Sequence, residues 1–537
     1  MSAPPMDRHA SVDYIVVGAG SAGCALAHRL SEDARVLLLE RGGPDSQEFL
    51  HDPSQILQAI FADPNLSVPY MTQEQSRLAG RNIPIHRGIV QGGCSSINGM
   101  VYIRGNREDY DHWAGLGNDG WSYREVLPYF KRSERYAETD SEYHGASGPL
   151  DVRPLPNPSP AAEAFVEAAA RLPEFRDSHP GFDFNGPRQQ NGAGLYRVTV
   201  TPEGRRASAA VAFLNPLRDR PTLRIETNTL VTGIAIEGRR AVGVRCQVNG
   251  EEQVLRAERE VILAAGAFES PRLLLLSGIG PAAHLRMLGI QPIVDLPGVG
   301  QNLQDHLMMV TYWPCRKPAG ASTFIAEAGL FLNSATRALD APPDLQYHFL
   351  AGMAGLAADP IQEPNFLFCP TLVHPHSRGE VRLQSLDPQA PLIIQPNYLQ
   401  HAVDCDVLVR GMELARELAG TRPLSDFRSA AQPFVAIASD GGVVRVPLLQ
   451  DSSRLRQVIA EAAQTVWHPV GTCKMGHDSL AVVDPLLRVY GVDSLRVADA
   501  SIMPVITRGN TNAPAIMIGE RAAALMSRPT STSAVAS

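Results

Sequence analysis

The sequence predicts an α/β fold (α+β overall). A mostly parallel sheet assembled from non-contiguous segments is joined to a second domain with an antiparallel sheet and helices. Two observations favour this fold: a complete strand–helix–strand unit near the N-terminus, and a strand-to-glycine pattern that returns at residues 261–266. The 537 residues are too many for one ordinary core, which indicates two or more domains.

Composition and charge exclude several classes of protein. An apolar fraction of 44% and a charged fraction of 19% are typical of a globular chain. The net charge of −8 argues against a nucleic-acid partner, which requires a basic face. Seven scattered cysteines without a Cys-x-x-Cys pair favour reduced thiols. Neither a secretory signal nor a run of about 18 apolar residues is visible, so we expect a cytoplasmic protein without a membrane span.

The N-terminal unit begins with a β-branched run at 12–17, which is typical of a buried parallel strand. A glycine turn at 18–23 follows, then helix-forming residues up to Leu30. A second strand at 36–39 ends at Glu40, twenty residues after Gly20. Strand, glycine turn, helix, strand and acid together form one complete βαβ unit of the Rossmann type.

This unit predicts a dinucleotide site. Gly18 permits the tight turn, Gly20 lets the backbone approach a pyrophosphate, and Gly23 allows close packing of helix on strand. The helix N-terminus presents free N–H groups to the phosphates, and Glu40 can accept from ribose hydroxyls. A glycine cluster without a ligand is the weaker alternative, and FAD and NAD are both open at this point. The residues assigned to this part of the site are Gly18, Gly20, Ser21, Ala22, Gly23, Glu40 and Arg41.

The remaining elements follow in order. Residues 45–82 are expected to be irregular, 116–136 and 163–171 helical, and 149–160 a linker. Short strands are expected between 223 and 261, and a proline-rich second domain between 314 and 452. A last buried strand covers 495–499, a closing helix covers 512–526, and the tail after it is expected to be disordered.

Four further segments carry a family resemblance. Residues 87–101 (Arg-Gly-Ile-Val-Gln-Gly-Gly-Cys-Ser-Ser-Ile-Asn-Gly-Met-Val) and 266–280 resemble the two signatures of the glucose–methanol–choline (GMC) oxidoreductases. The C-terminal segments 468–472 (His-Pro-Val-Gly-Thr) and 509–514 (Gly-Asn-Thr-Asn-Ala-Pro) resemble the family's active-site motifs. The first signature departs from the family pattern at Ile89, Gln91 and Cys94. Bacterial aryl-alcohol and hydroxymethylfurfural oxidases are the members that the chain resembles in particular.

The resemblance implies FAD as the cofactor. Ile97 stands where covalently flavinylated members carry a histidine in or near the loop, so the flavin is expected to be non-covalent. An FAD-binding domain is expected from 1–155, 222–312 and 462–527, a substrate domain from 156–221 and 313–461, and a tail at 528–537. Besides the glycine loop, the residues expected to contact FAD are Gly92, Gly93, Asn98, Gly99, Met100, Val101, Val231, Ala265, Trp467, Asp499, Ala500, Asn510 and Thr511.

The resemblance also assigns the chemistry. His468 is the candidate base that removes the hydroxyl proton while a hydride passes to flavin N5, and Asn512 is expected to hold the alcohol oxygen. Alone, His468 before a proline would be interpreted as a structural histidine, and Asn512 can also cap a helix. His374 and His376 lack neighbouring ligands at suitable spacing, so no metal site is expected.

Aromatic residues suggest the substrate. Trp467 and Phe434 are expected to line the substrate pocket, and with Phe366 and Phe368 they favour an aryl or furfuryl alcohol. Molecular oxygen is the expected electron acceptor, giving hydrogen peroxide. A choline-type or other alcohol dehydrogenase that reduces a quinone or another electron acceptor is the main alternative. A non-redox lyase, a photodecarboxylase or a silent flavin-binding protein is a weaker one, and the oligomeric state is left open.

Overall fold

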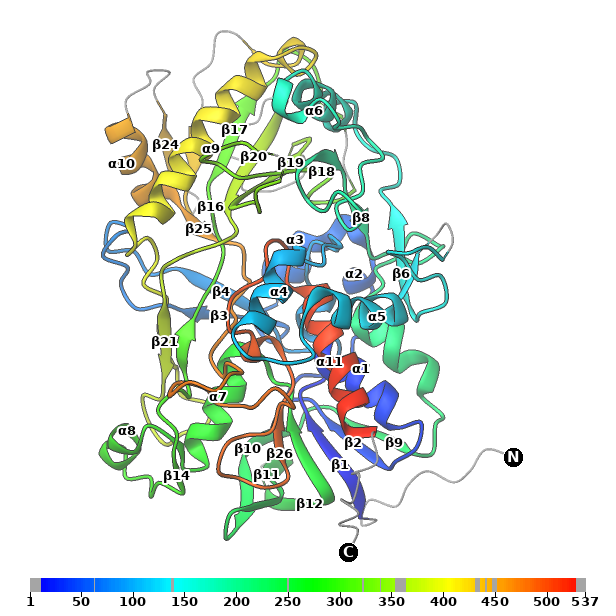
Figure 1. Ribbon diagram of the computed structural model, residues 1–537, viewed down its shortest axis with the longest axis vertical. Helices are drawn as coiled ribbons and strands as arrows, with labels where there is room; N and C mark the ends of the chain where they lie inside the picture. Colours follow the sequence, from blue (N-terminus) through cyan, green and yellow to red (C-terminus); the bar gives the residue numbers. More distant parts are fainter. Residues whose placement is uncertain are drawn as a thin grey trace, which may run out of the picture.

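The computed structural model describes most of the chain. Figure 1 shows an antiparallel sheet in its upper half, between helices α9 and α6, and a parallel sheet in its lower half, with α1 and α11 in front. This arrangement confirms the predicted α/β fold with a cofactor domain and a substrate domain. The described residues are 11–61, 63–136, 140–248, 251–320, 323–338, 340–352, 364–429, 435–439, 442–446 and 452–527.

The lower sheet is the Rossmann-type sheet. Its strands run in the order β10-β11-β12-β1-β2-β9, and β26 pairs with β12. The core pairs β12–β1, β1–β2, β2–β9 and β12–β26 are parallel, and β10 and β11 extend β12 as an antiparallel meander. The bounds are β1 Val12–Val17, β2 Val36–Leu39, β9 Leu223–Glu226, β10 Leu230–Glu237, β11 Arg240–Val248, β12 Glu251–Leu263 and β26 Leu495–Val497.

Helices α1 (Ser21–Leu30) and α11 (Asn512–Ser527) lie side by side on this sheet, although they come from opposite ends of the chain. Gly519 makes that approach possible, because a Cβ there would lie 2.3 Å from the carbonyl oxygen of Ala22. Helix α7 (Gly266–Leu276) follows β12 and is buried along most of its length, as the run of leucines predicts.

The upper sheet is antiparallel and belongs to the substrate domain. Its strands run in the order β18-β19-β20-β17-β23-β24, with β16 attached to β20 and β25 to β16. The bounds are β16 Leu307–Met308, β17 Val310–Pro314, β18 Ala328–Leu332, β19 Leu345–Leu350, β20 Asn365–Leu372, β23 Val435–Ile437, β24 Val443–Arg445 and β25 Gln464–Thr465.

The two faces of this sheet are used differently. Phe349, Phe366 and Phe368 pack with Trp313 and with Phe165 of α6 (Pro160–Ala170) in the core of the substrate domain. Alternate residues on the same strands point to the opposite face. Register places the rings of Phe366 and Phe368 on the core face, so these two aromatics do not support the aryl or furfuryl substrate expected from the sequence.

The connecting segments contain more structure than the sequence predicts. Capping boxes at Asn106 and Ser122 begin two separate helices. Helix α4 ends at Gly115, before the segment 116–136 that was expected to be helical, and within that segment α5 covers Tyr123–Ser133. The segment expected to be irregular contains α3 and β3, and the expected linker contains β6. The other bounds are α2 Glu48–His51, α3 Ile56–Phe61, β3 Ser67–Met71, β4 Pro84–Gly88, α4 Arg107–Gly115, α5 Tyr123–Ser133, β5 Glu134–Tyr136, β6 Leu150–Pro154, β7 Gly192–Leu195, β8 Arg197–Val198, β13 Ile279–Gly280, α8 Ala282–Met287, β14 Val294–Asp295, β15 Gln301–Leu303, β21 Gly379–Arg382, β22 Ile393–Gln395, α9 Ala402–Gly420 and α10 Ser452–Ala462.

The segment 156–221, expected to lie in the substrate domain as a whole, divides between two cores. Its first part, α6, packs against the antiparallel sheet. Its last part, from Ala207 to Leu217, packs in the core that contains β1 and α1. The predicted tail at 528–537 lies outside the described residues.

Candidate active site

The glycine turn after β1 is shaped to receive a ligand. Gly18 has φ +102°, a conformation that favours glycine. A Cβ on Gly23 would lie 1.9 Å from the carbonyl oxygen of Gly18, so helix and strand approach as predicted. A Cβ on Gly20 would meet nothing within 4 Å, which leaves open space above the N-terminus of α1.

Glu40, at the end of β2, holds the glycine turn in place. Its carboxylate accepts hydrogen bonds from the backbone N–H groups of Ala19 (2.9 Å) and Gly42 (2.8 Å). Burial raises the pKa of this carboxyl, while the two backbone donors lower it. Glu40 therefore fixes the backbone of the glycine turn and also lines the adjoining cavity.

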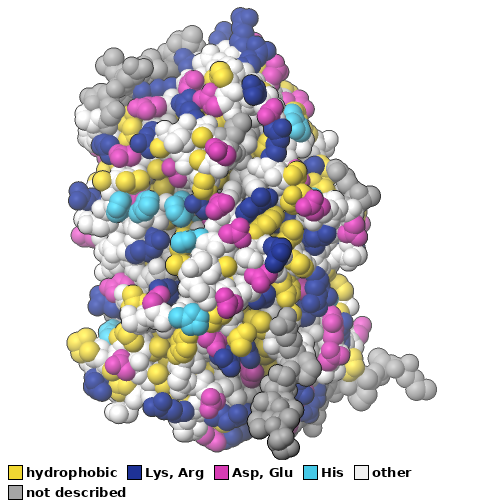
Figure 2. Space-filling model, in the orientation of Figure 1, with side chains coloured by type: hydrophobic (Ala, Val, Ile, Leu, Met, Phe, Trp, Pro, Cys, Tyr) yellow, Lys and Arg dark blue, Asp and Glu magenta, His cyan; other side chains and the backbone are white. Residues whose placement is uncertain are grey.

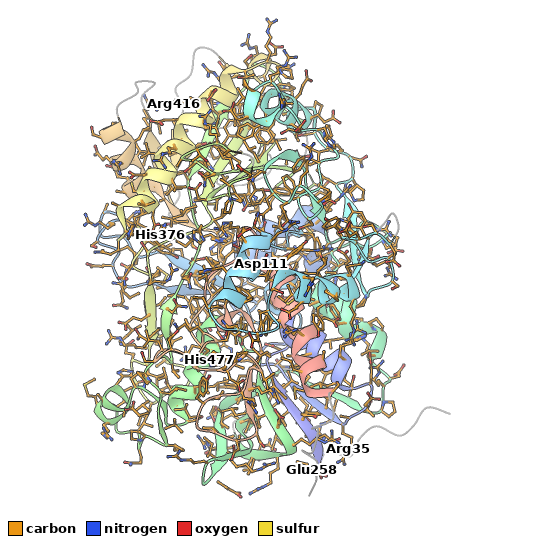
Figure 3. All side chains as sticks on the ribbon, viewed as in Figure 1. Arg35, Asp111, Glu258, His376, Arg416 and His477 are labelled. Carbon is orange, nitrogen blue, oxygen red and sulfur yellow. The ribbon has the colours of Figure 1, made fainter. Side chains whose placement is uncertain are left out.

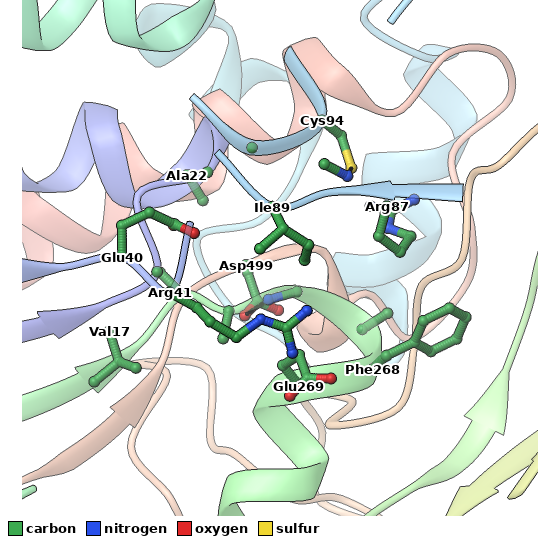
Figure 4. Close-up of a pocket in the computed structure, with 18 of the residues that line it drawn as sticks. Val17, Ala22, Glu40, Arg41, Arg87, Ile89, Cys94, Phe268, Glu269 and Asp499 are labelled. Carbon is green, nitrogen blue, oxygen red and sulfur yellow. Dashed lines mark hydrogen bonds between the residues drawn. The ribbon is translucent and has the colours of Figure 1, made fainter. Parts of the chain in front are cut away.

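A cavity of about 1030 Å³, including its open mouth, runs along the carboxyl edge of the parallel sheet (Figure 4). Its position at the end of the parallel strands is the usual place for a dinucleotide in this type of fold. Arg41 extends across it toward Glu269 (Figure 4). The predicted cofactor residues that line it are Gly18, Gly20, Ser21, Ala22, Glu40, Arg41, Gly93, Val231, Ala265, Asp499 and Ala500.

Asp499 follows β26 and caps the start of α7. Its Oδ2 accepts from the backbone N–H of Gly266 at 2.8 Å and from the Ser270 hydroxyl at 2.5 Å, and its Oδ1 accepts from the Ser501 N–H. The side chain thus ties β26 to α7 at the wall of the cavity.

The loop 92–101 crosses from this cavity toward the substrate domain. Gly92 and Gly93 have positive φ, and a Cβ on Gly93 would lie 2.8 Å from the Cα of Gly20. Gly99 packs against Ile325, and Val101 lies in an apolar cluster with Phe331 of β18. The loop therefore connects the glycine turn to the antiparallel sheet.

His468 lies in the turn after β25. Asp305 holds this turn, because its Oδ1 accepts from the His468 backbone N–H at 2.8 Å and its Oδ2 accepts from Thr465 and Tyr398. Burial lowers the pKa of His468 well below 6.5, and His306, His348 and Arg87 lower it further. His468 is consequently a neutral imidazole at neutral pH, as a proton acceptor must be.

His306 contacts the imidazole of His468 directly. The two Nδ1 atoms lie 3.0 Å apart, so one must donate and the other accept. Burial lowers the pKa of His306 to about 3, so this imidazole is neutral as well and carries one ring proton. Its Nε2 makes no hydrogen bond to any described residue, and with the proton there its Nδ1 accepts. His468 then donates from Nδ1 and keeps Nε2 as its basic atom.

Strand β19 supplies two further polar side chains, His348 and Gln346. His348 contacts the Tyr196 hydroxyl through Nδ1 at 3.0 Å, and the amide nitrogen of Gln346 donates to the same hydroxyl at 2.9 Å. Gln346 also approaches Oδ1 of Asn510 at 3.5 Å. Burial lowers the pKa of His348 to about 4, so this imidazole is also neutral.

Asn512 faces the cofactor domain. Its Oδ1 accepts from the Ser21 hydroxyl at 2.7 Å, at the first residue of α1. Asn510, two residues earlier, is directed instead toward Gln346 of the substrate sheet. In both side chains the oxygen is engaged and the amide N–H₂ is the group that can donate. Thr511 stands between them, and its carbonyl accepts the first backbone hydrogen bond of α11, from Ala515.

Trp467 has φ +63° and lies beside the loop 92–101. Its indole meets His86 and Phe61 edge-on, with ring centroids 6.0 and 6.3 Å away, and it joins an apolar cluster with Ile97 and Ile325. Arg87 donates to its carbonyl oxygen at 2.8 Å. Phe434, the other predicted pocket aromatic, lies outside the described residues.

The structure also bears on metal binding, membrane spanning, disulfide bonds and surface charge. Within the described ranges, no group of three or more His, Cys, Asp or Glu is arranged to hold a metal ion, and no helix is long and apolar enough to cross a membrane. All seven cysteines are free. Figure 2 shows acidic and basic side chains interspersed over the visible face.

The site contains residues that the sequence did not single out as functional. The sequence alone assigns no role to His306 or Asp305, yet both contact the residue proposed as the base. His348 and Gln346 belong to no motif, and only strand alternation on β19, once its register is known, places them together.

Comparison with known proteins agrees with this geometry. Models of the GMC oxidoreductases match residues 12–308 and 375–519. An oxygen-dependent choline dehydrogenase of Sinorhizobium fredii (strain NBRC 101917 / NGR234) is 41% identical over 550 residues, with 95% of this chain and 94% of the relative covered.

Solved structures agree as well. The crystal structure of pyridoxine 4-oxidase from Mesorbium loti superposes with a TM-score of 0.85 and 31% identity, covering 95% of this chain and 98% of that one. A fungal aryl-alcohol oxidase gives a TM-score of 0.79 at 22% identity, covering 96% and 98%, which shows the fold alone. None of these three is a bacterial aryl-alcohol or hydroxymethylfurfural oxidase, so that narrower resemblance is left as a proposal.

Proposed function

The chain belongs to the GMC oxidoreductase family and uses FAD to oxidise CH–OH groups, and from this premise we propose that its substrate is an uncharged primary alcohol with an aryl or furfuryl body. The product is the aldehyde. Molecular oxygen is the proposed acceptor of the electrons, giving hydrogen peroxide, and FAD is proposed to be bound without a covalent link.

The observation that carries this proposal is the chemistry of the sheet face toward the cofactor domain. Tyr312, Leu350, Leu367, Cys369 and Val435 form an apolar cluster there, joined by the partly buried Met308, Val310, Ile325 and Ile437. Strand alternation places His348, a neutral imidazole, and Gln346 on the same face as Leu350. An apolar, uncharged substrate body suits such a surface, whereas a buried cationic one has to be paired with an anion.

In the proposed mechanism, His468 removes the hydroxyl proton of the alcohol at Nε2. His306 keeps that atom unprotonated by accepting from Nδ1 of His468, and Asp305 holds the turn that carries the base. FAD, when bound, supplies N5 as the acceptor of the hydride from the alcohol carbon.

The alcohol oxygen needs a second polar group. Asn512 is the proposed donor, with its amide oxygen held by Ser21 and its N–H₂ left to donate. Asn510 is the second candidate, because its contact with Gln346 directs it toward the substrate sheet. Neither amide titrates, so His468 carries the proton transfer alone.

A choline-type dehydrogenase is the alternative function, favoured by the 41% identity to an oxygen-dependent choline dehydrogenase. It differs from the proposal in two properties, the positive charge of the substrate and the electron acceptor. The nearest carboxylate to the base, Asp305, is already engaged by Thr465, Tyr398 and the His468 N–H. This leaves no free anion beside the base among the described residues for a quaternary ammonium group.

The test follows the visible absorbance of the bound flavin. We expect anaerobic benzyl alcohol to bleach it within seconds, and air to restore it rapidly with one hydrogen peroxide formed per turnover. Slow recovery in air but fast recovery with a quinone would indicate a dehydrogenase. Bleaching by choline, with none by benzyl or furfuryl alcohol, would refute the proposed substrate class. Release of the flavin on denaturation in acid tests the non-covalent attachment.

A further inference from the structure

Arg206 is a buried cation beneath the loop 92–101. Its side chain is 1% exposed, and Nε donates to the carbonyl oxygen of Leu50 at 2.8 Å. Nη1 donates to the carbonyl oxygens of Asn98 at 2.6 Å and Ser95 at 3.3 Å. Every one of these partners is a neutral backbone group, and two of them belong to the loop expected to lie along the flavin.

The same guanidinium fixes the orientation of the Asn98 side chain. Nη1 also donates to Asn98 Oδ1 at 3.0 Å, and the Met100 backbone N–H donates to that oxygen at 3.0 Å. Arginine and a backbone N–H can only donate, so the atom between them must be the amide oxygen. The N–H₂ of Asn98 is therefore turned away from Arg206 and presented as a donor on the other side of the loop.

The charge of Arg206 has no protein counter-ion in the part of the chain that the structure describes. Nη2 is buried and makes no hydrogen bond there. Burial lowers the pKa of Arg206 to about 9, so the side chain still carries its charge at neutral pH. A buried, unpaired cation costs free energy unless an anion compensates it. The loop that Arg206 holds also lines the cavity, through Gly93 and Cys94.

We propose that Arg206 is a positioning residue that orients the Asn98 amide toward the flavin, and that its unpaired charge raises the reduction potential of the flavin. A hydride carries two electrons and one proton, so its transfer from the alcohol adds one negative charge to the flavin. A nearby fixed cation and an amide donor both stabilise that extra charge. The inference rests on the loop lying beside the flavin, and it is independent of which alcohol is the substrate.

The test measures the midpoint potential of the bound flavin against a redox dye, with an enzymatic reductant and no alcohol. Arg206→Met should lower the potential by about 30 mV or more, which is a tenfold change for a two-electron couple. Arg206→Lys keeps the charge and should stay much closer to the parent protein. Arg205→Met is the matched control: this neighbour forms an exposed ion pair with Glu48 at 2.5 Å, and its loss should leave the potential unchanged.

Equal potentials for Arg206→Met, Arg206→Lys and the parent protein would overturn the inference. If Arg206→Met does not retain FAD, Arg206→Gln replaces it, and equal potentials for the Gln and Lys variants would overturn the electrostatic role. The FAD dissociation constant of each apoprotein gives the second readout. Arg206→Met should weaken FAD binding at least tenfold and Arg205→Met less than twofold, and equal weakening by both would contradict the positioning role.

Discussion

The two walls of the active site recognise their ligands by different means. The carboxyl edge of the parallel sheet presents backbone N–H groups of the glycine turn and of the helix start. Two of its acids, Glu40 and Asp499, are occupied in holding that backbone. The face of the antiparallel sheet presents side chains. Two of them, His348 and Gln346, are polar and uncharged, and the others are mostly apolar. Binding at the first wall therefore depends on the shape of the backbone, whereas binding at the second depends on the chemistry of the side chains.

This difference predicts that the chemistry can be lost while the cofactor stays bound. His468→Ala removes the base but no residue of the cavity at the parallel sheet. We expect FAD content to be unchanged and the rate constant of flavin reduction by alcohol to fall roughly 10²–10⁴-fold. Stopped-flow absorbance measures this rate.

A matched control for that variant is His376→Ala, since His376 lies at the surface away from the cavity (Figure 3). It should reduce its flavin at the parent rate. Near-normal reduction by His468→Ala would remove His468 from the role of base.

The converse variant acts on the other wall. In Gly23→Ala the new Cβ would lie 1.9 Å from the Gly18 carbonyl oxygen, so the glycine turn must shift. We expect the FAD dissociation constant to rise roughly 10–100-fold, or about 1.4–2.8 kcal/mol, when titrated by flavin fluorescence. Gly115→Ala, where a Cβ meets nothing within 4 Å, is the control. Unchanged FAD affinity in Gly23→Ala would show that the turn does not govern cofactor binding.

Replacing His306 tests whether the base depends on its neighbour. His306→Leu removes the acceptor of the His468 Nδ1 proton, so the Nε2-basic tautomer is no longer enforced. We expect flavin reduction to slow by roughly tenfold, well short of the loss in His468→Ala. FAD binding should be unaffected. A loss as large as that of His468→Ala would instead indicate that His306 itself takes the proton.

A carboxylate on the apolar wall should change which substrates are accepted. Met308 is two residues after His306, partly buried, and packed against the apolar cluster. Met308→Glu is expected to raise the preference for choline over benzyl alcohol about tenfold, equivalent to 1.4 kcal/mol, because it supplies a counter-ion. Val443→Glu, at an exposed position on β24, should not change this ratio. An unchanged ratio in Met308→Glu would place the substrate elsewhere.

The smallest effect expected is that of pH. His468 must be neutral to accept a proton, and its pKa lies well below 6.5, so protonation sets in only in acid. Burial raises the pKa of Asp305, which holds the base, to about 6. The rate constant of flavin reduction should therefore be constant from pH 8 to about pH 6.5 and decline at or below pH 6. A decline centred at pH 7 or above would contradict the assigned environment of His468.

The same contrast between the walls explains what the sequence predicts well. The cofactor wall consists of short contiguous motifs, so the bounds of β1 and β2 and the roles of Gly18 and Gly23 follow from local pattern. The substrate wall is assembled by strand pairing across long sequence separations. Register decides that Phe366 and Phe368 face the core while Gln346 and His348 face the site, and no local motif encodes that register.

Some residues are predicted only in part, because the sequence shows their motif but not the contacts that they make. Asn510 and Asn512 occur in one motif, yet the geometry of the turn before α11 directs one toward Gln346 and the other toward Ser21. Arg206 lies outside every recognised motif, and only the fold shows that it holds Asn98. Domain bounds are also intermediate, because residues 207–217 return to the first core after α6 has packed in the second.

The central claim, that the substrate is an uncharged alcohol, is tested most directly by two alcohols of the same shape. Choline and 3,3-dimethylbutan-1-ol differ in charge, with a quaternary nitrogen in one and a quaternary carbon in the other. The measurement is the second-order rate constant of anaerobic flavin reduction by each. The account predicts that the neutral alcohol reduces the flavin at least about tenfold faster, a difference of about 1.4 kcal/mol. Faster reduction by choline would contradict it.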